Sequence, residues 1–580
     1  MRWLVFFTLQ LSFIFIIISV GYWISSKYLN RIGLKKTFWI DRICIAAFIT
    51  IFLFAILGIF ILFLPRNMRQ LISGLILACL FLASLYTFIS NKYYKYLLEV
   101  KYIEKIFLIG VIIMSGLGLS LSLLPVKLPT KLIDGPYVAK HDYLGVRIQY
   151  ITGNLPTDNS LPHVVSEYLL RDISFKKEHP IMPGQEISNR PILVSLLLVP
   201  IRAAFSPPPK LPNGLPKFNY VGNTWPDFSV LMKDDFGYLF SLSIGITLNA
   251  LILLSVGAFA IRISNQSKII AFSVVALMIS SPYFIFQTIF TWPKELAAFF
   301  VLYSILLYYK LKSPSLSGAF LAFGYLSHPY VVVFFIGFIL YEIYNLFKNL
   351  ILQIQTEKSE DKENSTFNTK FNNKNLTFNK INTLTKKLFF HIKLLKKRDF
   401  KNIIYFLATF GILVTPWFIW SRIILHISSD LISQNFFQNG QSLIDFFWIR
   451  PVNFFNATLP VYLLHYPFNL NNLVLDSSVT IPGAIGILIF GFSLMYLYEC
   501  SFEKNKTFFV YIPSLLLIFI FSNQAVPTLH GLQGPVALLL LVGVVQIQKM
   551  FSNTKILFTL LSSQIVINIF LLGNYFYSLV

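Results

Sequence analysis

Two short polar stretches carry the residues best suited to chemistry in an otherwise apolar chain. In "GPYVAKHDYLGV", His141 and Asp142 stand side by side just beyond a long apolar segment. A carboxylate fixed there, near a membrane surface, can act as a general base. In "TWPKE", Lys294 and Glu295 follow Trp292 at the start of another apolar segment. A lysine and the free backbone amides at such a helix start can together bind an anion. We expect both stretches on the same side of the membrane.

Two further residues are candidates for the same site. Arg190 precedes the apolar segment "PILVSLLLVPIRAAF", and its guanidinium together with free helix amides would form an anion site. His328 lies in "GYLSHP" beside a helix-breaking proline, where it is suited either to bonding exposed backbone carbonyls or to touching a substrate. Structural interpretations stand beside these: Asp142 as a helix cap, Trp292 as an interfacial belt residue and Lys294 as a snorkelling anchor.

The composition determines which elements position these residues. The chain has 580 residues, of which 56% are hydrophobic and only 13% charged, and its mean hydropathy is +0.67. Apolar runs of roughly 20 residues, the length of helix that crosses a bilayer, recur throughout. The sequence therefore predicts an all-α polytopic transmembrane helical bundle with about 12 to 14 spans. The expected spans lie near 3–25, 42–64, 69–90, 104–125, 237–262, 269–290, 295–310, 315–327 with 329–347, 403–425, 481–500, 508–523, 531–548 and 556–578.

The net charge of +23 would suit nucleic-acid binding, but its distribution argues for a membrane instead. The cations cluster in loops between apolar segments, and the positive-inside rule makes those loops cytoplasmic. The segments 126–236 and 426–480 then lie outside, an assignment that Arg66 and Arg69 oppose. We expect a multi-pass protein of a bacterial inner (plasma) membrane. The cationic loops carry Lys27, Arg31, Lys35 and Lys36, then Lys92, Lys95, Lys101 and Lys105, and the basic run 348–402.

The chain divides into four parts on this pattern. The part containing all the candidate residues includes the long outside loop, in which we expect helices near 161–174 and 191–205 lying against the outer bilayer face. Segment 315–327 is too short to cross upright, so it is either a broken helix or half of a tight pair. The parts are N-terminal spans 1–103, the core 104–347 with loop 126–236, a basic low-complexity cytoplasmic loop 348–402, and C-terminal spans 403–580 with outside loop 426–480.

The core 104–347 resembles the GT-C class of polytopic glycosyltransferases, which use sugars carried on polyprenyl phosphates. The resemblance is carried by "HDYLGV" opening the long outside loop, by "RPIL" leading a second apolar helix, by "SSPYFIFQTIFTWPKELAAFF" and by "GYLSHP". It implies an active site facing the periplasm or exterior. It also implies Asp142 as the base that takes a proton from the acceptor hydroxyl, while Lys294 and Arg190 hold the donor phosphate with or without a divalent metal ion. Single displacement would invert the anomeric carbon.

Two other classes remain open at this point. A cell-surface polysaccharide polymerase or ligase would place its working residues in the late outside loop, where His426, Arg450 and His465 occur. A transporter would show matching halves, discontinuous helices and ionisable residues at mid-membrane depth. The feature that separates these classes is which outside loop faces a cavity that contains both Asp142 and Lys294.

Overall fold

The computed structural model confirms an all-α architecture. It describes residues 2–31, 37–125, 151, 157–173, 175, 187, 191–207, 235–264, 266–365, 397–426, 442, 444, 447–451, 484–499, 506–520, 531–551 and 553–579, and within these ranges it contains helices and no β-strand. His141, Asp142 and Arg190 lie outside the described residues. The amphipathic segment after the low-complexity tract lies outside them too.

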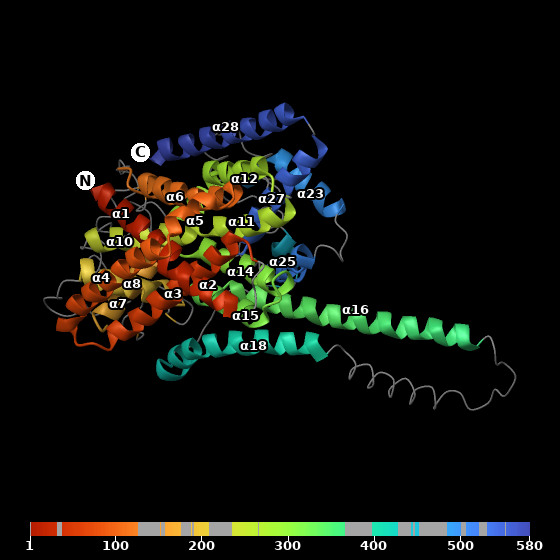
Figure 1. Cartoon of the computed structure of the whole chain (residues 1–580), viewed down its shortest axis with the longest axis horizontal. Helices are drawn as coiled ribbons and strands as arrows, with labels where there is room; N and C mark the ends of the chain where they lie inside the picture. The colour runs from red at the N-terminus through yellow and green to blue at the C-terminus, as the bar shows by residue number, and fades with distance from the viewer. Residues whose placement is uncertain are drawn as a thin grey trace.

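The helices gather into one body, from which α16 extends at its C-terminal end (Figure 1). The N-terminal helices are α1 (Arg2–Ile16), η1 (Ile17–Gly21), α2 (Tyr22–Arg31), α3 (Trp39–Leu62), α4 (Arg66–Ser90) and α5 (Tyr93–Glu99). The central ones are α6 (Tyr102–Ser122), η6 (Thr157–Ser160), α7 (Leu161–Leu170), α8 (Leu193–Phe205), α10 (Asp235–Ala250), α11 (Ile252–Ile263), α12 (Lys268–Ser280), α13 (Pro282–Ile289), α14 (Lys294–Tyr309), α15 (Pro314–Ser327) and α16 (Val331–Ser365). The C-terminal ones are α18 (Lys397–Phe418), η8 (Ile419–Ile424), α23 (Ile487–Glu499), α24 (Lys506–Phe509), α25 (Tyr511–Ile520), α27 (Gln533–Met550) and α28 (Thr554–Leu579).

The protein is a multi-pass membrane protein by the length and hydropathy of these helices. Among the described residues, nine helices are long and apolar enough to span a membrane, and the pair α12 and α13, bent by 64°, would make a tenth. The predicted 12 to 14 spans also counted α14, α15, α23 and α25, which are shorter. The sequence thus located the apolar segments, and α14 and α15, whose neighbours on both sides are described, are shorter than a full span.

Segment 315–327 forms half of a tight helical pair. Two serines join α14 to α15: the Ser304 hydroxyl donates to the Ser317 carbonyl at 2.9 Å, and the Ser317 hydroxyl donates to the Ser304 carbonyl at 2.8 Å. On its other side, α15 presents Gly318 to the Phe406 carbonyl of α18, where a Cβ would not fit. Small residues let these helices approach closely, which is how helices associate in a membrane.

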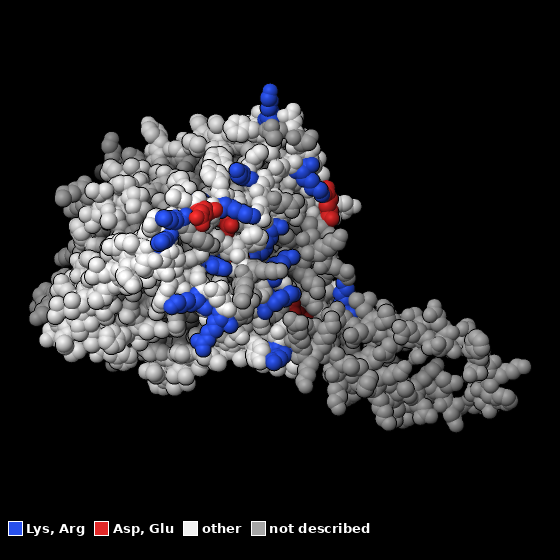
Figure 2. Space-filling view, in the orientation of Figure 1, with Lys and Arg blue, Asp and Glu red and all other residues white. Residues whose placement is uncertain are grey.

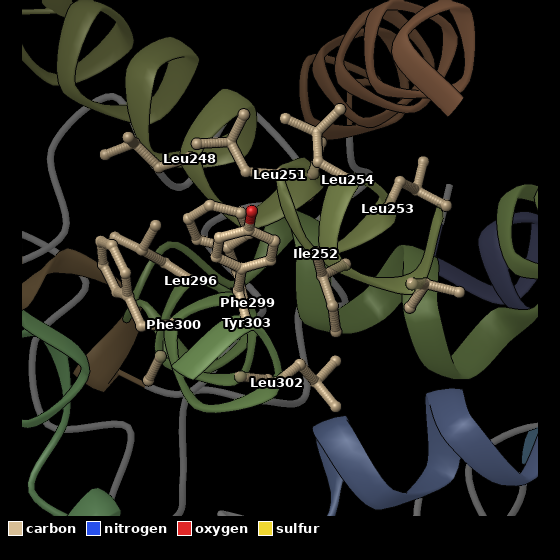
Figure 3. Close-up of a cluster of buried hydrophobic side chains, with 14 of the residues drawn as sticks. Leu248, Leu251, Ile252, Leu253, Leu254, Leu296, Phe299, Phe300, Leu302 and Tyr303 are labelled. Carbon is tan, nitrogen blue, oxygen red and sulfur yellow. The ribbon is translucent and has the colours of Figure 1, made fainter. Parts of the chain in front are cut away.

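A central part of the apolar core lies between α10 and α11 on one side and α14 on the other. Figure 3 shows Leu251 and Ile252 facing Phe299 and Tyr303, and all four side chains are buried. This packing holds α14 firmly in the middle of the bundle, so the residues of its first turn have a fixed position.

Exposed lysines and arginines mark one set of helix ends, and Figure 2 shows such side chains gathered over the middle of one face, with few acidic ones. Contacts tie these ends together: Lys101 donates to Gln266 at 2.6 Å, and Gln548 donates to Ser267 at 3.1 Å. We call these ends the basic face and the opposite ends, which carry α7 and α8, the loop face. The basic face is defined by Lys27, Arg31, Lys92, Lys95, Lys101, Lys268, Lys310, Lys312 and Lys401.

Candidate functional site

The stretches "TWPKE" and "SHP" meet at the loop face. Lys294 begins α14, His328 follows the last residue of α15, and the rings of Trp292 and His328 lie 4.3 Å apart between centroids. Tyr330 completes the junction, because its hydroxyl donates to the Lys294 carbonyl at 2.8 Å and its amide donates to His328 Nδ1 at 3.2 Å. The structure therefore brings together four of the predicted residues, counting Glu295 beside Lys294 on the same helix turn.

Lys294 is buried against aromatic rings. Its side chain belongs to a residue only 7% exposed, and its ammonium lies 4.5 Å from the centroid of Phe290 and 5.5 Å from that of Trp292. The ring faces attract the cation, an interaction that strengthens where water is excluded. This arrangement differs from the snorkelling anchor considered for Lys294, which would extend along the helix to reach water. A positive charge is instead fixed at the turn before α14.

The backbone amides at the start of α14 are largely in use. The Lys294 amide donates to the Trp292 carbonyl at 2.7 Å, and the Leu296 amide donates to Asn249 Oδ1 at 3.3 Å. Asn249, fully buried in α10, also donates to the Phe290 carbonyl at 2.9 Å and so holds the turn from both sides. An anion at this turn would therefore depend on the ammonium of Lys294 more than on helix amides.

Glu295 is a fully buried carboxylate with one side engaged. Its Oε2 accepts a hydrogen bond from the Thr288 hydroxyl at 2.8 Å, and its Oε1 has no hydrogen-bond partner among the described residues. Tyr330 lies within electrostatic reach of Glu295, of Tyr283 and of Tyr511. Sequence reasoning missed these three tyrosines, because a tyrosine in an apolar helix carries no signal that separates it from a packing residue.

The helices that carry this site are shorter than a bilayer core. The 16 residues of α14 and the 14 residues of α15 rise roughly 24 Å and 21 Å at about 1.5 Å per residue, against about 30 Å of hydrocarbon. Both run between the basic face and the site. The ends of α14 and α15 at the loop face should therefore lie below the membrane surface. A lipid headgroup would reach them after a small movement into the membrane.

The described part of segment 126–236 contacts the turn beside Lys294. The Thr291 hydroxyl donates to the Asn159 carbonyl at 2.6 Å, and the Thr291 amide donates to the Asn159 side chain. Asn159 belongs to η6, which leads directly into α7. The described part of segment 126–236 is thus bonded to the neighbour of Trp292, and both residues of this contact are buried.

The two helices predicted in this segment exist, but they pack inside the protein. We expected them near 161–174 and 191–205 on the outer bilayer face, and the structure has α7 and α8 there. Nearly every residue of α7 is buried, and α8 packs against α3 and α4, where Gly58 leaves no room for a Cβ beside the Leu196 carbonyl. The polar side of α7 faces protein groups, so the expected position on the bilayer surface is wrong.

A buried ion network explains this difference. Glu167 of α7 and Arg202 of α8 are both fully buried, and Arg202 Nε donates to Glu167 Oε1 at 3.1 Å. Arg171 donates to the other carboxylate oxygen at 3.1 Å, and His163 Nδ1 lies 2.9 Å from the Ser241 hydroxyl of α10. Paired in this way, charged side chains can be removed from water, so the network fixes α7 and α8 to the bundle.

Arg66 and Arg69, which opposed the predicted sidedness, also bind this segment. Their guanidinium groups contact the two oxygens of Asp172 at 2.5 Å and 2.9 Å, and Arg69 donates to the Leu170 carbonyl at 2.9 Å. Burial by itself would raise the pKa of Asp172, but the hydrogen bonds and charges of the two arginines outweigh it and lower that pKa. Arg66 and Arg69 thus hold the end of α7 at the loop face.

Two of the three residues considered for a polymerase or ligase lie among the described residues. The Arg450 Nε donates to the Ile520 carbonyl at 2.5 Å and the residue is buried, while His426 lies just beyond η8 with a left-handed backbone, φ 54°. His465 lies outside the described residues. Among the described residues, no group of three or more His, Cys, Asp or Glu side chains is placed to hold a metal ion.

Comparison with known proteins gives no match to a protein family, to a curated sequence or to a solved structure. The site is therefore interpreted from its own geometry: a buried ammonium, a buried carboxylate and an aromatic cluster at the first turn of α14, with Asn159 of segment 126–236 bonded to that turn.

Proposed function

We propose that this chain is a GT-C type glycosyltransferase that transfers a sugar from a polyprenyl-phosphate donor to an extracytoplasmic acceptor. One observation carries the proposal: Asn159 of the outside segment is bonded to Thr291, three residues before Lys294. The segment that contains the expected base Asp142 is therefore anchored beside the cation expected to hold the donor phosphate. A glycosyl transfer needs both groups at one place.

The chemistry assigns each group one task. Asp142 takes the proton of an acceptor hydroxyl as that oxygen attacks the anomeric carbon, and the bond from this carbon to the phosphate oxygen breaks. The electron pair leaves with the lipid phosphate, whose negative charge Lys294 stabilises, with Arg190 as the second cation. His141 orients its neighbour, and His328 and Trp292 enclose the lysine. Displacement from one face inverts the anomeric carbon.

The depth of the site suits a lipid donor. A polyprenyl chain would stay in the hydrocarbon while its phosphate reached Lys294 at the first turn of α14, a helix of 16 residues that is shorter than a bilayer core. The loop face would then face the periplasm or exterior of a bacterial inner membrane, because the exposed cations lie at the basic face.

A transporter is the second candidate, and two observations favour it. The helix pair α12 and α13 is bent by 64°, and Glu295 is an ionisable group buried among apolar helices. Discontinuous helices and buried carboxylates are typical of transporters. Uptake of a labelled sugar or ion into proteoliposomes, without glycosyl transfer, would favour this class.

The proposal is tested by the apparent affinity for polyprenyl-phosphate hexoses in detergent or nanodiscs. Lys294→Ala should weaken it about 10- to 100-fold, because a hydrogen bond to a charged group contributes about 1.5 to 3 kcal/mol. Lys310→Ala, at the other end of the same helix, is the matched control and should leave it unchanged. Unchanged affinity in Lys294→Ala would remove this residue from donor binding.

A further inference from the structure

Three buried oxygen atoms near the start of α14 have no hydrogen-bond partner among the described residues. They are Glu295 Oε1, the Tyr283 hydroxyl and the Tyr511 hydroxyl. Their residues are 0%, 2% and 5% exposed and come from α14, α13 and α25 respectively. Three separate helices therefore each contribute a polar atom that its own surroundings leave unbonded.

Such atoms are unusual in a folded protein. The large majority of buried side-chain polar atoms have a partner, and inside a bilayer no bulk water replaces a missing one. Elsewhere in this bundle, tyrosines do find partners: Tyr303 donates to Asp41 Oδ1 at 3.2 Å, and Tyr308 donates to Glu342 at 3.2 Å. Single buried hydroxyls without a partner, such as those of Thr50 and Ser73, also occur among the described residues, but here three such oxygens come from helices that meet around Tyr330.

The three groups are neighbours of one residue, Tyr330. The side chains of Glu295, Tyr283 and Tyr511 all lie within its electrostatic reach, and Glu295 and Tyr283 are within reach of each other. Tyr330 itself is bonded to the Lys294 carbonyl, so the cluster adjoins the turn that carries the ammonium. Phe334 lines it from α16, with ring centroids 5.8 Å from Tyr330 and 5.9 Å from Tyr511.

We propose that Glu295, Tyr283 and Tyr511 form a binding subsite for the hydroxyl groups of a polyhydroxylated ligand. A carboxylate accepts hydrogen bonds from hydroxyls, and tyrosine hydroxyls both donate and accept, so the set matches several hydroxyls at once. A phosphate does not match this set, because a carboxyl group and two tyrosines supply no cation, and it belongs to Lys294 on the adjoining turn. A few polar groups in an apolar, aromatic surrounding are typical of small-molecule sites.

The ligand follows from the neighbouring site. Resting on the proposed function, we assign the hydroxyls to the sugar ring of the donor, whose phosphate contacts Lys294. The subsite then deepens that function by naming the residues that distinguish a glycosylated lipid phosphate from a bare one.

The first test needs no ligand. Tyr283→Phe and Tyr511→Phe should leave the Tm of the purified, ligand-free protein unchanged or raise it, because each removes an unbonded polar atom. Tyr303→Phe is the control and should lower the Tm, since its hydroxyl is bonded to Asp41. Lowered Tm values in both Tyr283→Phe and Tyr511→Phe would show that these hydroxyls support the fold, and would overturn the subsite.

The second test compares three probes by the Tm increase they cause: polyprenyl phosphate, polyprenyl-phosphate hexoses and methyl hexosides. Glu295→Gln and Tyr283→Phe should weaken apparent binding of the glycosylated lipid at least 10-fold while binding of polyprenyl phosphate stays unchanged, and Lys294→Ala should weaken both lipids. Equal binding of the glycosylated lipid by wild type and these variants would overturn the subsite. If methyl hexosides raise the Tm of the wild-type protein and neither lipid does, this result would support the subsite and overturn the proposed donor. Stabilisation by none of the probes would overturn both.

Discussion

Two buried carboxylates at opposite ends of the bundle show how differently this protein uses the same chemical group. Asp41 lies at the basic face, where its Oδ2 accepts from Arg262 at 2.8 Å and from the Phe38 amide at 2.9 Å, and its Oδ1 accepts from Tyr303 at 3.2 Å. Glu295 lies at the loop face, where Thr288 is its only hydrogen-bond donor among the described residues. Both carboxylates are fully buried.

The difference separates a structural carboxylate from one available to a ligand. Tyr303 and Glu295 stand on the same helix, so α14 contributes to a completed network in its inner part and to an incomplete one at its first turn. A buried carboxyl group whose oxygens all have hydrogen-bond partners stabilises the fold. A buried carboxyl group with an oxygen that lacks a partner destabilises the fold, and such groups are retained where they serve binding or catalysis. We infer that the inner part of α14 supports the fold and that its first turn supports function.

Breaking the complete network should have the largest effect on stability. Arg262→Met removes the countercharge of Asp41 and leaves a carboxylate buried without its cation, which typically costs about 3 to 5 kcal/mol. We expect a markedly lower Tm and a reduced yield of folded protein, measured in detergent. Arg262→Lys keeps a charge but loses the guanidinium geometry, so its Tm should lie between those of wild type and Arg262→Met. A Tm equal to that of wild type in Arg262→Met would show that Asp41 is no structural anchor.

The ion pair of Asp172 should have a smaller and pH-dependent effect. Its pKa is lowered in the folded state, so its contribution is present above the unfolded-state value of about 3.9 and is lost as the pH falls through the folded pKa. Because this carboxylate is partly exposed, we expect at most about 1 kcal/mol. Asp172→Asn should lower the Tm at pH 7 and have little effect near pH 2. An equal difference at both pH values would contradict the role of its charge.

Substitution of the incomplete carboxylate should change stability least. Glu295→Gln keeps the shape of the side chain and an oxygen to accept from Thr288, so the free energy of unfolding should change by less than about 1 kcal/mol. Sugar transfer should nevertheless fall. Thermal unfolding and transfer rates measured on one preparation would show this, and a loss of stability as large as that of Arg262→Met would remove the contrast between the two carboxylates.

The sequence was sufficient for most of the fold because a bilayer imposes long apolar helices. The apolar runs predicted nearly every helix, including the short partner of α14, and "TWPKE" and "SHP" proved to be neighbours. The position of α7 was wrong for a physical reason. His163, Glu167 and Arg171 recur at helical spacing and imitate a solvated face, while their partner Arg202 lies 35 residues from Glu167 in the sequence.

The tyrosines of the proposed subsite could not have been found in this way. Tyr283, Tyr330 and Tyr511 lie in three separate apolar segments, and only the folded bundle shows that Tyr330 is near the other two. What identifies them is the lack of a hydrogen-bond partner for Tyr283 and Tyr511 among the described residues. That property depends on every neighbour in space and has no signature in local sequence.

The central claim is that the loop face carries a glycosyl transfer site, and the most direct measurement is turnover of Asp142→Asn. Purified wild-type protein and this variant would be supplied with saturating radiolabelled polyprenyl-phosphate hexoses and an acceptor extract of the cell envelope. We expect transfer by wild type and a loss of at least about 100-fold in the variant, with unchanged Tm and donor binding, because the side chains are nearly isosteric and only the base is removed. Near-normal turnover in the variant, or no transfer by wild type from any donor, would contradict the claim.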